Sequence, residues 1–227
     1  MVGVRFLLLV LLLDPLSATA AAADPARLRL ASVQAVVAPV EGDAEDVLFA
    51  LHADRVVPIA SVTKLLTALV VLESGEALDA WLPIVDWQER PPNNAYSRMR
   101  IGSELRRGDL LRIALMSSEN LATHVLAHHH PGGEPAFVAA MNETAARLSM
   151  AGARFVDPAG LSPANVASAR DVLALLRAAW AHEEIRAYTG TAQFTARFRA
   201  PRYTLGYGNT NPLVASSRYD VALSKTG

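Results

Sequence analysis

One helix of this chain has no polar face. The residues between Pro58 and Gly75 predict a helix from about Ser61 to Ser74, in which almost every position after the first turn is aliphatic or alanine. A surface helix is apolar on one side only, whereas a helix that is apolar all round must be buried. We therefore expect this helix to run through the core, with the rest of the chain packed around it.

A lysine lies in the first turn of this helix. Of the 21 basic residues in the chain, only Lys64 and Lys225 are lysines, so 19 (21 − 2) are arginines. An unpaired charge in a buried helix is costly, which counts against a merely solvated Lys64. Arginine stays protonated, whereas a desolvated lysine loses its proton readily and is then a base. The pattern indicates that these two positions need an amine.

Ser61 and Lys64 are three residues apart, so their side chains share one face at the start of the helix. Serine is a weak nucleophile until a base takes its proton, and a neutral lysine is such a base. The helix N-terminus also favours negative charge near Ser61. The alternative is that Ser61 only caps the helix and Lys64 is solvated, since SxxK alone is common by chance.

Composition narrows the class of protein. A chain of 227 residues, 52% hydrophobic and 19% charged, is long enough for one domain with one core. Its net charge of -1 provides no basic field, so we expect no nucleic-acid partner. Because the chain has no cysteine, any nucleophile must be an oxygen or an amine.

The N-terminus has the pattern of a secretory signal peptide. Arg5 precedes an apolar run from Phe6 to Leu13, and small residues follow. This run is far shorter than the ~20 residues of a membrane-spanning helix, which favours cleavage over anchoring. We expect residues 1–23 to be removed, with cleavage between Ala20 and Ala23. Residues 24–227 would then form a periplasmic catalytic domain without a transmembrane anchor.

Strand patterns lie at both ends of the chain, with helical patterns between them. Leu30 to Arg55 predicts a hairpin around the turn Glu41-Gly42-Asp43, and the final RYDVALSKTG predicts a strand. Helices are expected over DLLRIALM, NLATHVLAHH, Pro135 to Met150, and SARDVLALLRAAW with its Ser168/Asp171 capping box. The order predicts one α+β domain whose sheet pairs distant parts of the chain.

Three short motifs follow one another along the chain. They are SxxK at Ser61 to Lys64, SxN at Ser118-Glu119-Asn120, and KTG at Lys225-Thr226-Gly227. This set and order are typical of serine acyl-transferases, the penicillin-binding proteins and class A β-lactamases. Alone, the middle segment is explained as a capped junction between two helices. Because both lysines of the chain fall in these motifs, the chemical interpretation is favoured.

The chain resembles the low-molecular-mass penicillin-binding proteins, most closely the D-alanyl-D-alanine endopeptidase type. The likeness covers nearly all of residues 32–227 and rests on PIASVTKLLTALVVLE, LMSSENLATHVLAHHHPGG, FVDPAGLSPANVASARDV, NTNPLV and LSKTG. It implies a β-lactamase/transpeptidase-like α+β fold, with an antiparallel sheet and a mostly helical subdomain. It also implies peptidoglycan peptides as substrates, β-lactams as covalent inhibitors, and neither cofactor nor metal. The loop from Gly160 to Asp171 is assigned no chemistry.

The resemblance implies three catalytic residues. Ser61 would attack the carbonyl of a D-alanine residue, with Lys64 as the general base, and water would hydrolyse the resulting acyl-enzyme. Ser118 would relay a proton to the leaving amine. The family is expected to have Asp where this chain has Glu119, and that side chain is expected to point away from the substrate.

Four further residues are expected to bind the substrate. Asn120 would hydrogen-bond the substrate amide, and Lys225 would hold the Ser118 hydroxyl and the charge of the substrate. Thr226 would bind the substrate carboxylate. Gly227 would leave room for close approach of the backbone, with the KTG strand pairing to the extended peptide at the sheet edge.

Relatives continue past KTG with more strands and a helix, whereas this sequence stops at Gly227. In the family the next residue supplies the second N–H of the oxyanion hole, and losing one such donor costs about 100- to 1,000-fold in rate. We therefore expect the sequence to be a fragment, truncated after the KTG strand. We also expect the 227-residue product alone to be unstable or nearly inactive.

Other functions stay open at this point. A β-lactamase needs a deacylating Glu in a pattern such as ExxLN, and none occurs around Glu134, Glu143, Glu183 or Glu184. A non-catalytic wall-binding or regulatory remnant is a third possibility. Nothing in the residues separates endopeptidase from carboxypeptidase activity, because pocket shape selects the leaving group.

A run of histidines, His124 and His128 to His130, invites a metal hypothesis, because i and i+4 side chains share a helix face. However, no Glu follows His124 as the zinc-peptidase pattern HExxH requires. We favour a simpler role for these histidines at a helix C-terminus, where the dipole favours positive charge.

Overall fold

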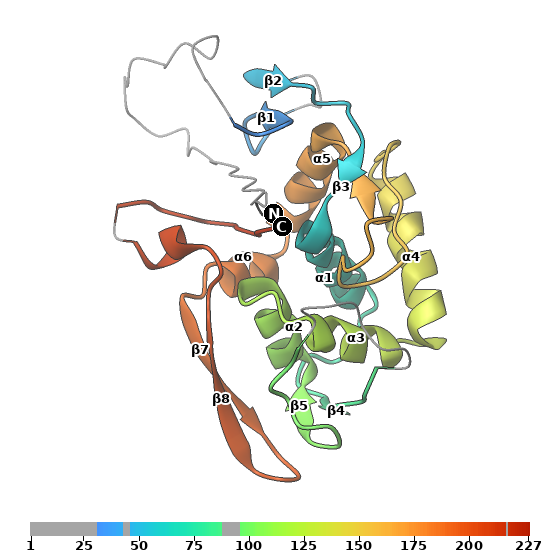
Figure 1. The fold of residues 1–227 in the computed structure, drawn as a ribbon, viewed down its shortest axis with the longest axis vertical. Helices are drawn as coiled ribbons and strands as arrows, with labels where there is room; N and C mark the ends of the chain where they lie inside the picture. Colours follow the sequence, from blue (N-terminus) through green and yellow to red (C-terminus); the bar gives the residue numbers. More distant parts are fainter. Residues whose placement is uncertain (1–30, 43–45, 88–95, 217) are drawn as a thin grey trace, which may run out of the picture.

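The chain folds around the helix that the sequence places in the core. The computed structural model describes residues 31–42, 46–87, 96–216 and 218–227 (Figure 1). Helix α1, Thr63–Glu73, follows the short 3-10 turn η2, Ala60–Val62. Every α1 residue as far as Val71 is buried, and Gly75 follows the helix with a left-handed φ of 69°. The prediction of a fully buried helix is confirmed.

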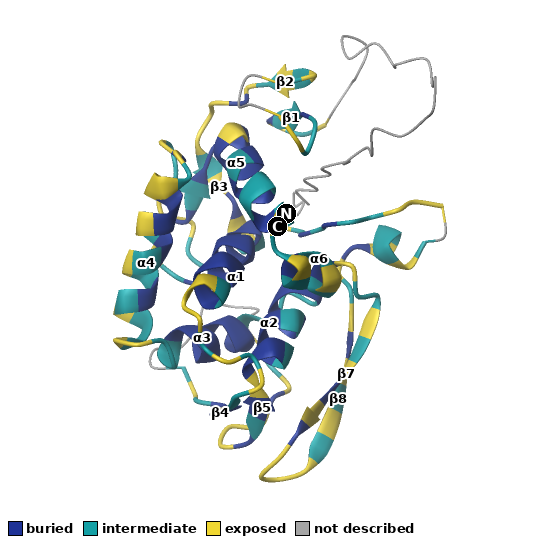
Figure 2. Ribbon diagram, turned by 180° about the vertical axis from the view of Figure 1, so that it is seen from behind, coloured by how far each residue is buried: buried dark blue, intermediate teal, exposed yellow. Residues whose placement is uncertain are grey.

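Four helices pack directly on α1, two of them the predicted helices that meet at the SxN motif. The remaining helical elements are α2 Arg107–Met116, α3 Asn120–His128, α4 Gly133–Arg147, α5 Ala169–Trp180, α6 Glu183–Thr189 and η3 Pro212–Ala215. Figure 2 shows α1, α2 and α3 almost entirely buried, whereas α4 exposes one side. The capping box of Ser168 and Asp171 is present at the start of α5.

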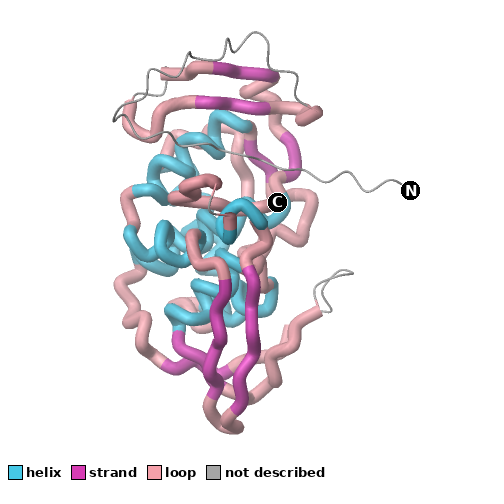
Figure 3. Tube along the Cα trace, turned by 90° about the vertical axis from the view of Figure 1, so that its left-hand side faces the viewer, coloured by secondary structure: helices cyan, strands magenta, loops and turns pink. Residues whose placement is uncertain are grey.

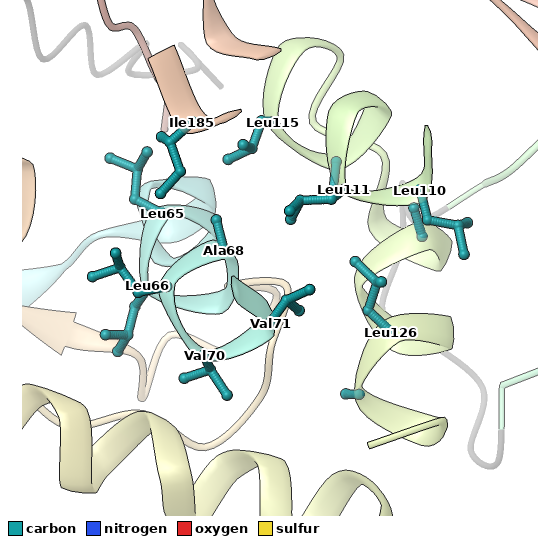
Figure 4. Packing of buried hydrophobic residues seen from close by; sticks show 14 of the residues in the cluster. Leu65, Leu66, Ala68, Val70, Val71, Leu110, Leu111, Leu115, Leu126 and Ile185 are labelled. Atoms are coloured by element: carbon teal, nitrogen blue, oxygen red, sulfur yellow. The ribbon is translucent and has the colours of Figure 1, made fainter. Parts of the chain in front are cut away.

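The core between these helices is made of interlocking aliphatic side chains. In Figure 4, Val71 of α1 lies among Leu111 of α2 and Leu126 of α3, and Ile185 of α6 lies near Leu65. Each of these side chains is at most 3% exposed. Fully burying such a side chain contributes about 1.5–3 kcal/mol. The start of α1, where the SxxK motif lies, is therefore held on a rigid helix.

The strands form four two-stranded antiparallel sheets. The pairs are β1 Ala35–Val37 with β2 Phe49–Leu51, β3 Val57–Pro58 with β6 Val166–Ala167, β4 Trp81–Pro83 with β5 Glu104–Arg106, and β7 Gln193–Phe198 with β8 Tyr203–Gly208. Figure 3 shows β1 and β2 at one end of the molecule and the long β7–β8 hairpin extending to the other. The molecule is α+β, and the predicted N-terminal hairpin is formed.

Two features of the strands differ from the sequence analysis. Residues 218–227 form no strand, so the prediction for RYDVALSKTG is wrong in this structure. The alternation of Val221 and Leu223 in the sequence indicates which side chains could face the core. A strand also needs a second strand beside it to accept and donate backbone hydrogen bonds. Among the described residues only the short β3–β6 pair joins distant parts of the chain in a named sheet, and the β7–β8 hairpin was not foreseen.

The predicted signal peptide, residues 1–23, lies outside the described residues, as does Asp43 of the predicted turn. In the part of the chain that the structure describes, no helix has both the length and the apolar character to cross a bilayer. The chain's end at Gly227 lies beside the start of α1 in the middle of the molecule (Figure 1). The KTG motif therefore reaches the SxxK motif.

Candidate active site

The SxxK motif lies where the chain enters α1. Ala60 adopts a left-handed φ of 46° and begins the turn η2, which carries Ser61. Ser61 is partly exposed, whereas Lys64, one turn later, is 0% exposed. Lys64 Nζ lies 2.9 Å from Ser61 Oγ. The structure thus brings the hydroxyl and the amine into hydrogen-bond contact at the helix N-terminus.

Oxygen atoms surround the amine of Lys64. Besides the serine hydroxyl, Asn120 Oδ1 lies 2.8 Å and the carbonyl oxygen of Ala159 lies 2.5 Å from Nζ. Burial lowers the pKa of Lys64 to about 7, although the negative charges of Asp157 and Glu119 act to raise it. Near neutral pH a large fraction of this lysine is therefore an uncharged amine.

The SxN motif forms the turn between α2 and α3. Ser118 has a left-handed φ of 58°, a conformation that is uncommon for a residue other than glycine. Asn120 is the first residue of α3. Glu119 faces the helix instead, because its carboxylate accepts a hydrogen bond from the backbone N–H of Leu121 at 3.1 Å. Burial raises the pKa of Glu119. The turn presents Ser118 and Asn120 to the two lysines and leaves Glu119 as a helix cap.

The KTG motif meets the SxN motif through its lysine. Lys225 Nζ lies 3.0 Å from Ser118 Oγ and donates to the carbonyl oxygen of Thr226 at 2.7 Å. Lys225 is 7% exposed, and burial, with a further contribution from the charge of Lys64, holds its pKa well below the ordinary value. The Thr226 hydroxyl lies 2.7 Å from that of Thr210. A second lysine, Lys225, is thus hydrogen-bonded to a second serine, Ser118.

Gly227 lies against the residues that flank Ser61. A Cβ at position 227 would be 3.0 Å from the carbonyl oxygen of Ile59 and 3.0 Å from Cγ2 of Val62. These distances are tighter than ordinary van der Waals contact. Glycine therefore permits this close approach of the C-terminal segment to the residues that flank Ser61.

Two groups in the site were not predicted. The carbonyl of Ala159 contacts Lys64, and the hydroxyl of Thr210 contacts Thr226. They lie in FVDPAGLSPANVASARDV and NTNPLV, stretches that carry the resemblance but received no chemical role. A backbone carbonyl has no signature in residue type, and a threonine is too common to stand out. Only the fold could reveal these contacts.

His124 and His129 make polar contacts with groups other than the two lysines. His124 is buried, with Nδ1 2.8 Å from Glu134 Oε2 and Nε2 3.2 Å from the carbonyl oxygen of Asp86. His128 ends α3 and His129 follows it, so His128 to His130 lie at a helix C-terminus, whereas His124 lies within the helix. Among the described residues, no three His, Cys, Asp or Glu side chains are grouped as metal ligands.

Taken together, the three motifs place a hydroxyl beside a buried amine with a lowered pKa, and a second hydroxyl beside a second lysine. A hydroxyl beside a neutral amine can be activated for nucleophilic attack, and a hydroxyl bonded to a lysine can pass on a proton. This chemistry fits acyl transfer through a serine ester.

Comparisons with known proteins agree with this geometry. The profile of the D-alanyl-D-alanine carboxypeptidase family matches residues 18–227. The D-alanyl-D-alanine endopeptidase of Pseudomonas aeruginosa is 44% identical over 203 residues, covering 89% of this chain and 65% of that protein. The Escherichia coli D-alanyl-D-alanine endopeptidase is also 44% identical, covering 92% of this chain and 67% of that protein. This chain thus spans about two thirds of the length of these relatives.

Solved structures show the same fold. The Streptomyces K15 DD-transpeptidase has a TM-score of 0.72 and 26% identity, covering 80% of this chain and 74% of that one. Penicillin-binding protein D2 of Listeria monocytogenes, solved in an ampicillin-bound form, has a TM-score of 0.69 and 28% identity, covering 83% and 76%. Because the family profile matches residues 18–227, which is nearly all of this chain, the chain belongs to the D-alanyl-D-alanine carboxypeptidase family of penicillin-binding proteins.

Proposed function

We propose that this chain carries the catalytic residues of a serine D,D-peptidase that hydrolyses D-alanyl peptide bonds of peptidoglycan. The observation that carries the proposal is the buried amine of Lys64, with a pKa of about 7, 2.9 Å from Ser61 Oγ. Two relatives at 44% identity are named endopeptidases, which favours cleavage of cross-links. The family description keeps carboxypeptidase activity as the alternative.

Acylation begins with proton transfer from Ser61 Oγ to the neutral Lys64 Nζ, while Oγ attacks the carbonyl carbon of the D-alanine residue. The backbone N–H of Ser61, in the turn before α1, and the helix dipole favour the negative charge that develops on the carbonyl oxygen. Asn120 would hold the substrate amide beside the lysine. The product of attack is a tetrahedral intermediate bonded to Ser61.

Collapse of the intermediate breaks the carbon–nitrogen bond, and the proton that Lys64 accepted passes through the Ser118 hydroxyl to the leaving amine, which returns Lys64 to its neutral form. The contact between Ser118 Oγ and Lys225 Nζ, at 3.0 Å, supports this relay. Water then attacks the ester, its proton passes to Lys64, and Ser61 regains its hydrogen. In this scheme Thr226 binds the carboxylate next to the scissile bond, and Lys225, which donates to the Thr226 carbonyl oxygen, supports this position.

The place of action and the inhibitor class are part of the same proposal. We expect a cleaved signal peptide over residues 1–23 and a periplasmic domain from residue 24, because the sequence pattern at the N-terminus favours export. The ampicillin-bound relative of this fold supports β-lactams as agents that acylate Ser61.

Labelling with a fluorescent penicillin tests the proposal in the full-length gene product. We expect a stable label on the wild type and none on Ser61→Ala. A matched control is Ser74→Ala at the opposite end of α1, whose hydroxyl bonds only the helix and its C-terminal loop. That control should label like the wild type. A wild type that takes no label, or that releases it rapidly as a β-lactamase does, would contradict the proposal.

Leaving-group preference is a separate measurement. Purified cross-linked muropeptide dimers and uncross-linked pentapeptides are offered in parallel, and products are followed by chromatography. Faster cleavage of the dimer supports the endopeptidase assignment. Faster release of free D-alanine would make the enzyme a carboxypeptidase, with the same catalytic residues.

A further inference from the structure

A loop with no assigned chemistry lies directly on the catalytic lysine. Residues 156–165 connect the region after α4 to β6, and the carbonyl oxygen of Ala159 lies 2.5 Å from Lys64 Nζ. Ala159 is 1% exposed, so water does not compete for this contact. The loop is therefore part of the immediate surroundings of the amine.

This contact restricts how a neutral amine is oriented. A neutral lysine has two N–H hydrogens and one lone pair, and a backbone carbonyl can only accept a hydrogen bond. With Ala159 O taking one hydrogen and Asn120 Oδ1 the other, the lone pair is left for the hydroxyl of Ser61. Only in this arrangement can the serine donate its proton to Lys64. When Lys64 is protonated, the same three oxygens accept its three hydrogens.

The position of the Ala159 carbonyl is set by the carboxylate of Asp157. Its Oδ1 accepts hydrogen bonds from the backbone N–H groups of Ala159, Gly160 and Leu161, at 2.8, 2.6 and 3.1 Å. Its Oδ2 accepts one from the backbone N–H of Ser162 at 2.9 Å. One carboxylate thus holds four consecutive amides of the loop. Charge-assisted bonds of this kind are about twice as strong as neutral ones.

The loop is also clamped to α1. Thr67 donates to the carbonyl oxygen of Pro158 at 2.6 Å, and Asn165 Nδ2 donates to Thr63 Oγ1 at 3.2 Å. Gly160, at φ 77°, lies so close that a Cβ would be 2.0 Å from the carbonyl oxygen of Ala60. The loop therefore contacts the helix on both sides of the lysine.

From these contacts we propose that Asp157 is a positioning residue, which holds the Ala159 carbonyl against Lys64 so that the amine's lone pair faces Ser61. The proposal rests on the function proposed above. Asp157 does not touch substrate or the reacting atoms; it acts through the loop backbone and, as a nearby negative charge, on the protonation of Lys64.

Two carboxylates act on the protonation of Lys64 from the elements around it, and the amine of Lys225 is in turn affected by the charge of Lys64. Asp157 lies in the loop and Glu119 in the turn before α3, and both favour the protonated lysine. Lys225 lies in the C-terminal segment, and its pKa is lowered by the charge of Lys64. Removing the charge of Asp157 should therefore lower the pKa of Lys64 further, and so let the lysine lose its proton at lower pH.

The test is the pH profile of acylation by fluorescent penicillin, measured for Asp157→Asn, Asp157→Glu and the loop control Ser162→Ala. The Asn variant loses the negative charge. One of its two side-chain polar groups is an NH₂, which cannot accept a hydrogen bond from the backbone N–H groups that the Asp157 carboxylate binds. We expect its maximal acylation rate to fall by up to about 100-fold, as a small misplacement of a catalytic group does. We also expect the acid limb of its profile to move to lower pH.

The other two variants separate charge from position. The Glu variant keeps the charge near Lys64 but cannot hold the same four amides, so its maximal rate should fall while its acid limb stays. Ser162→Ala keeps the backbone N–H and loses only a local bond to Ala164, so both features should match the wild type.

An Asn variant whose acid limb coincides with that of the wild type would overturn the proposal, because a merely structural role lowers the rate equally at every pH. If the Asn variant does not fold, the Glu variant decides, and an unchanged maximal rate there would be contrary to a positioning role. A wild type that labels normally in these experiments keeps the proposed function intact, whichever way Asp157 behaves.

Discussion

The two lysines of this chain are both buried, yet the structure holds them in different ways. Lys64 lies on α1, where a continuous apolar helix fixes its backbone and a loop carbonyl fixes its amine. Lys225 lies in residues 218–227, which form no helix or strand, and side-chain contacts hold this region. One of these is the bond from Asn211 Nδ2 to Ser224 Oγ, at 2.8 Å.

This difference separates two tasks. A general base has to keep one orientation through every proton transfer, and a buried helix with three oxygen partners provides that. A residue that binds the end of the substrate has to allow substrate binding and product release. A segment held by side-chain contacts is sufficient for that task. Changes around Lys64 should therefore reduce the chemical step, and changes around Lys225 should mainly weaken substrate binding.

The largest expected effect is the loss of the base. Lys64→Met should reduce acylation by about 100- to 10,000-fold, the range for removing a general base. Lys225→Met leaves Ser61 and Lys64 in contact but loses the hydrogen bond that holds Ser118, so it should raise KM for a D-alanyl peptide and lower kcat much less than Lys64→Met does. Steady-state kinetics of both variants measure this. Equal losses of kcat in the two variants would contradict the division of tasks.

Acylation should depend on pH through Lys64. Below its pKa of about 7 the lysine is protonated and cannot take the Ser61 proton, so the rate should fall about tenfold per pH unit there. Stopped-flow labelling from pH 5 to 9 records this limb. A rate that stays level down to pH 5 would disagree with a neutral lysine as base.

Stability should respond to the same proton with a definite sign. The pKa of Lys64 is about 7 in the folded state against an ordinary value of 10.5, so between these pH values the unfolded chain binds more protons. The contribution of Lys64 to the free energy of unfolding therefore rises with pH across this window. Urea unfolding at pH 7 and pH 9 should show a smaller rise in Lys64→Met than in the wild type.

Gly160→Ala should disturb the Lys64 side through the loop. The added Cβ meets the carbonyl oxygen of Ala60 at 2.0 Å, and the backbone has a φ of 77°. We expect a loss of about 1–3 kcal/mol in stability, together with slower acylation. Gly206→Ala is a useful comparison, because nothing lies within 4 Å of its Cβ position. Similar unfolding midpoints for the two variants would count against the tight loop contact.

The smallest effect is expected on the Lys225 side. Asn211→Ala removes the hydrogen bond to Ser224, worth about 0.5–1.5 kcal/mol, and also the bond from the Leu213 N–H to Asn211 Oδ1 that caps η3. If that loss appears in binding, KM for a D-alanyl peptide should rise about two- to tenfold, with kcat close to that of the wild type. Kinetics with a lowered kcat and an unchanged KM would place Asn211 in the chemical step instead.

The sequence predicted well what depends on local pattern. The apolar run after Ser61, the capping box at Ser168 and the three motifs each carry their signal in residue type and spacing. It did not predict the loop at Ala159, because that contact is made by a backbone carbonyl 95 residues from Lys64. It predicted a strand before Lys225 from alternation alone, although pairing depends on a neighbour that no local pattern contains.

Lys64→Arg tests the central claim most directly, because arginine keeps a long cationic side chain but stays protonated. The variant and the wild type are treated with fluorescent penicillin at pH 8, after circular dichroism has verified that both are folded. The neutral-amine account predicts a folded variant whose acylation is reduced at least about 100-fold. A folded variant that acylates at the wild-type rate would contradict it.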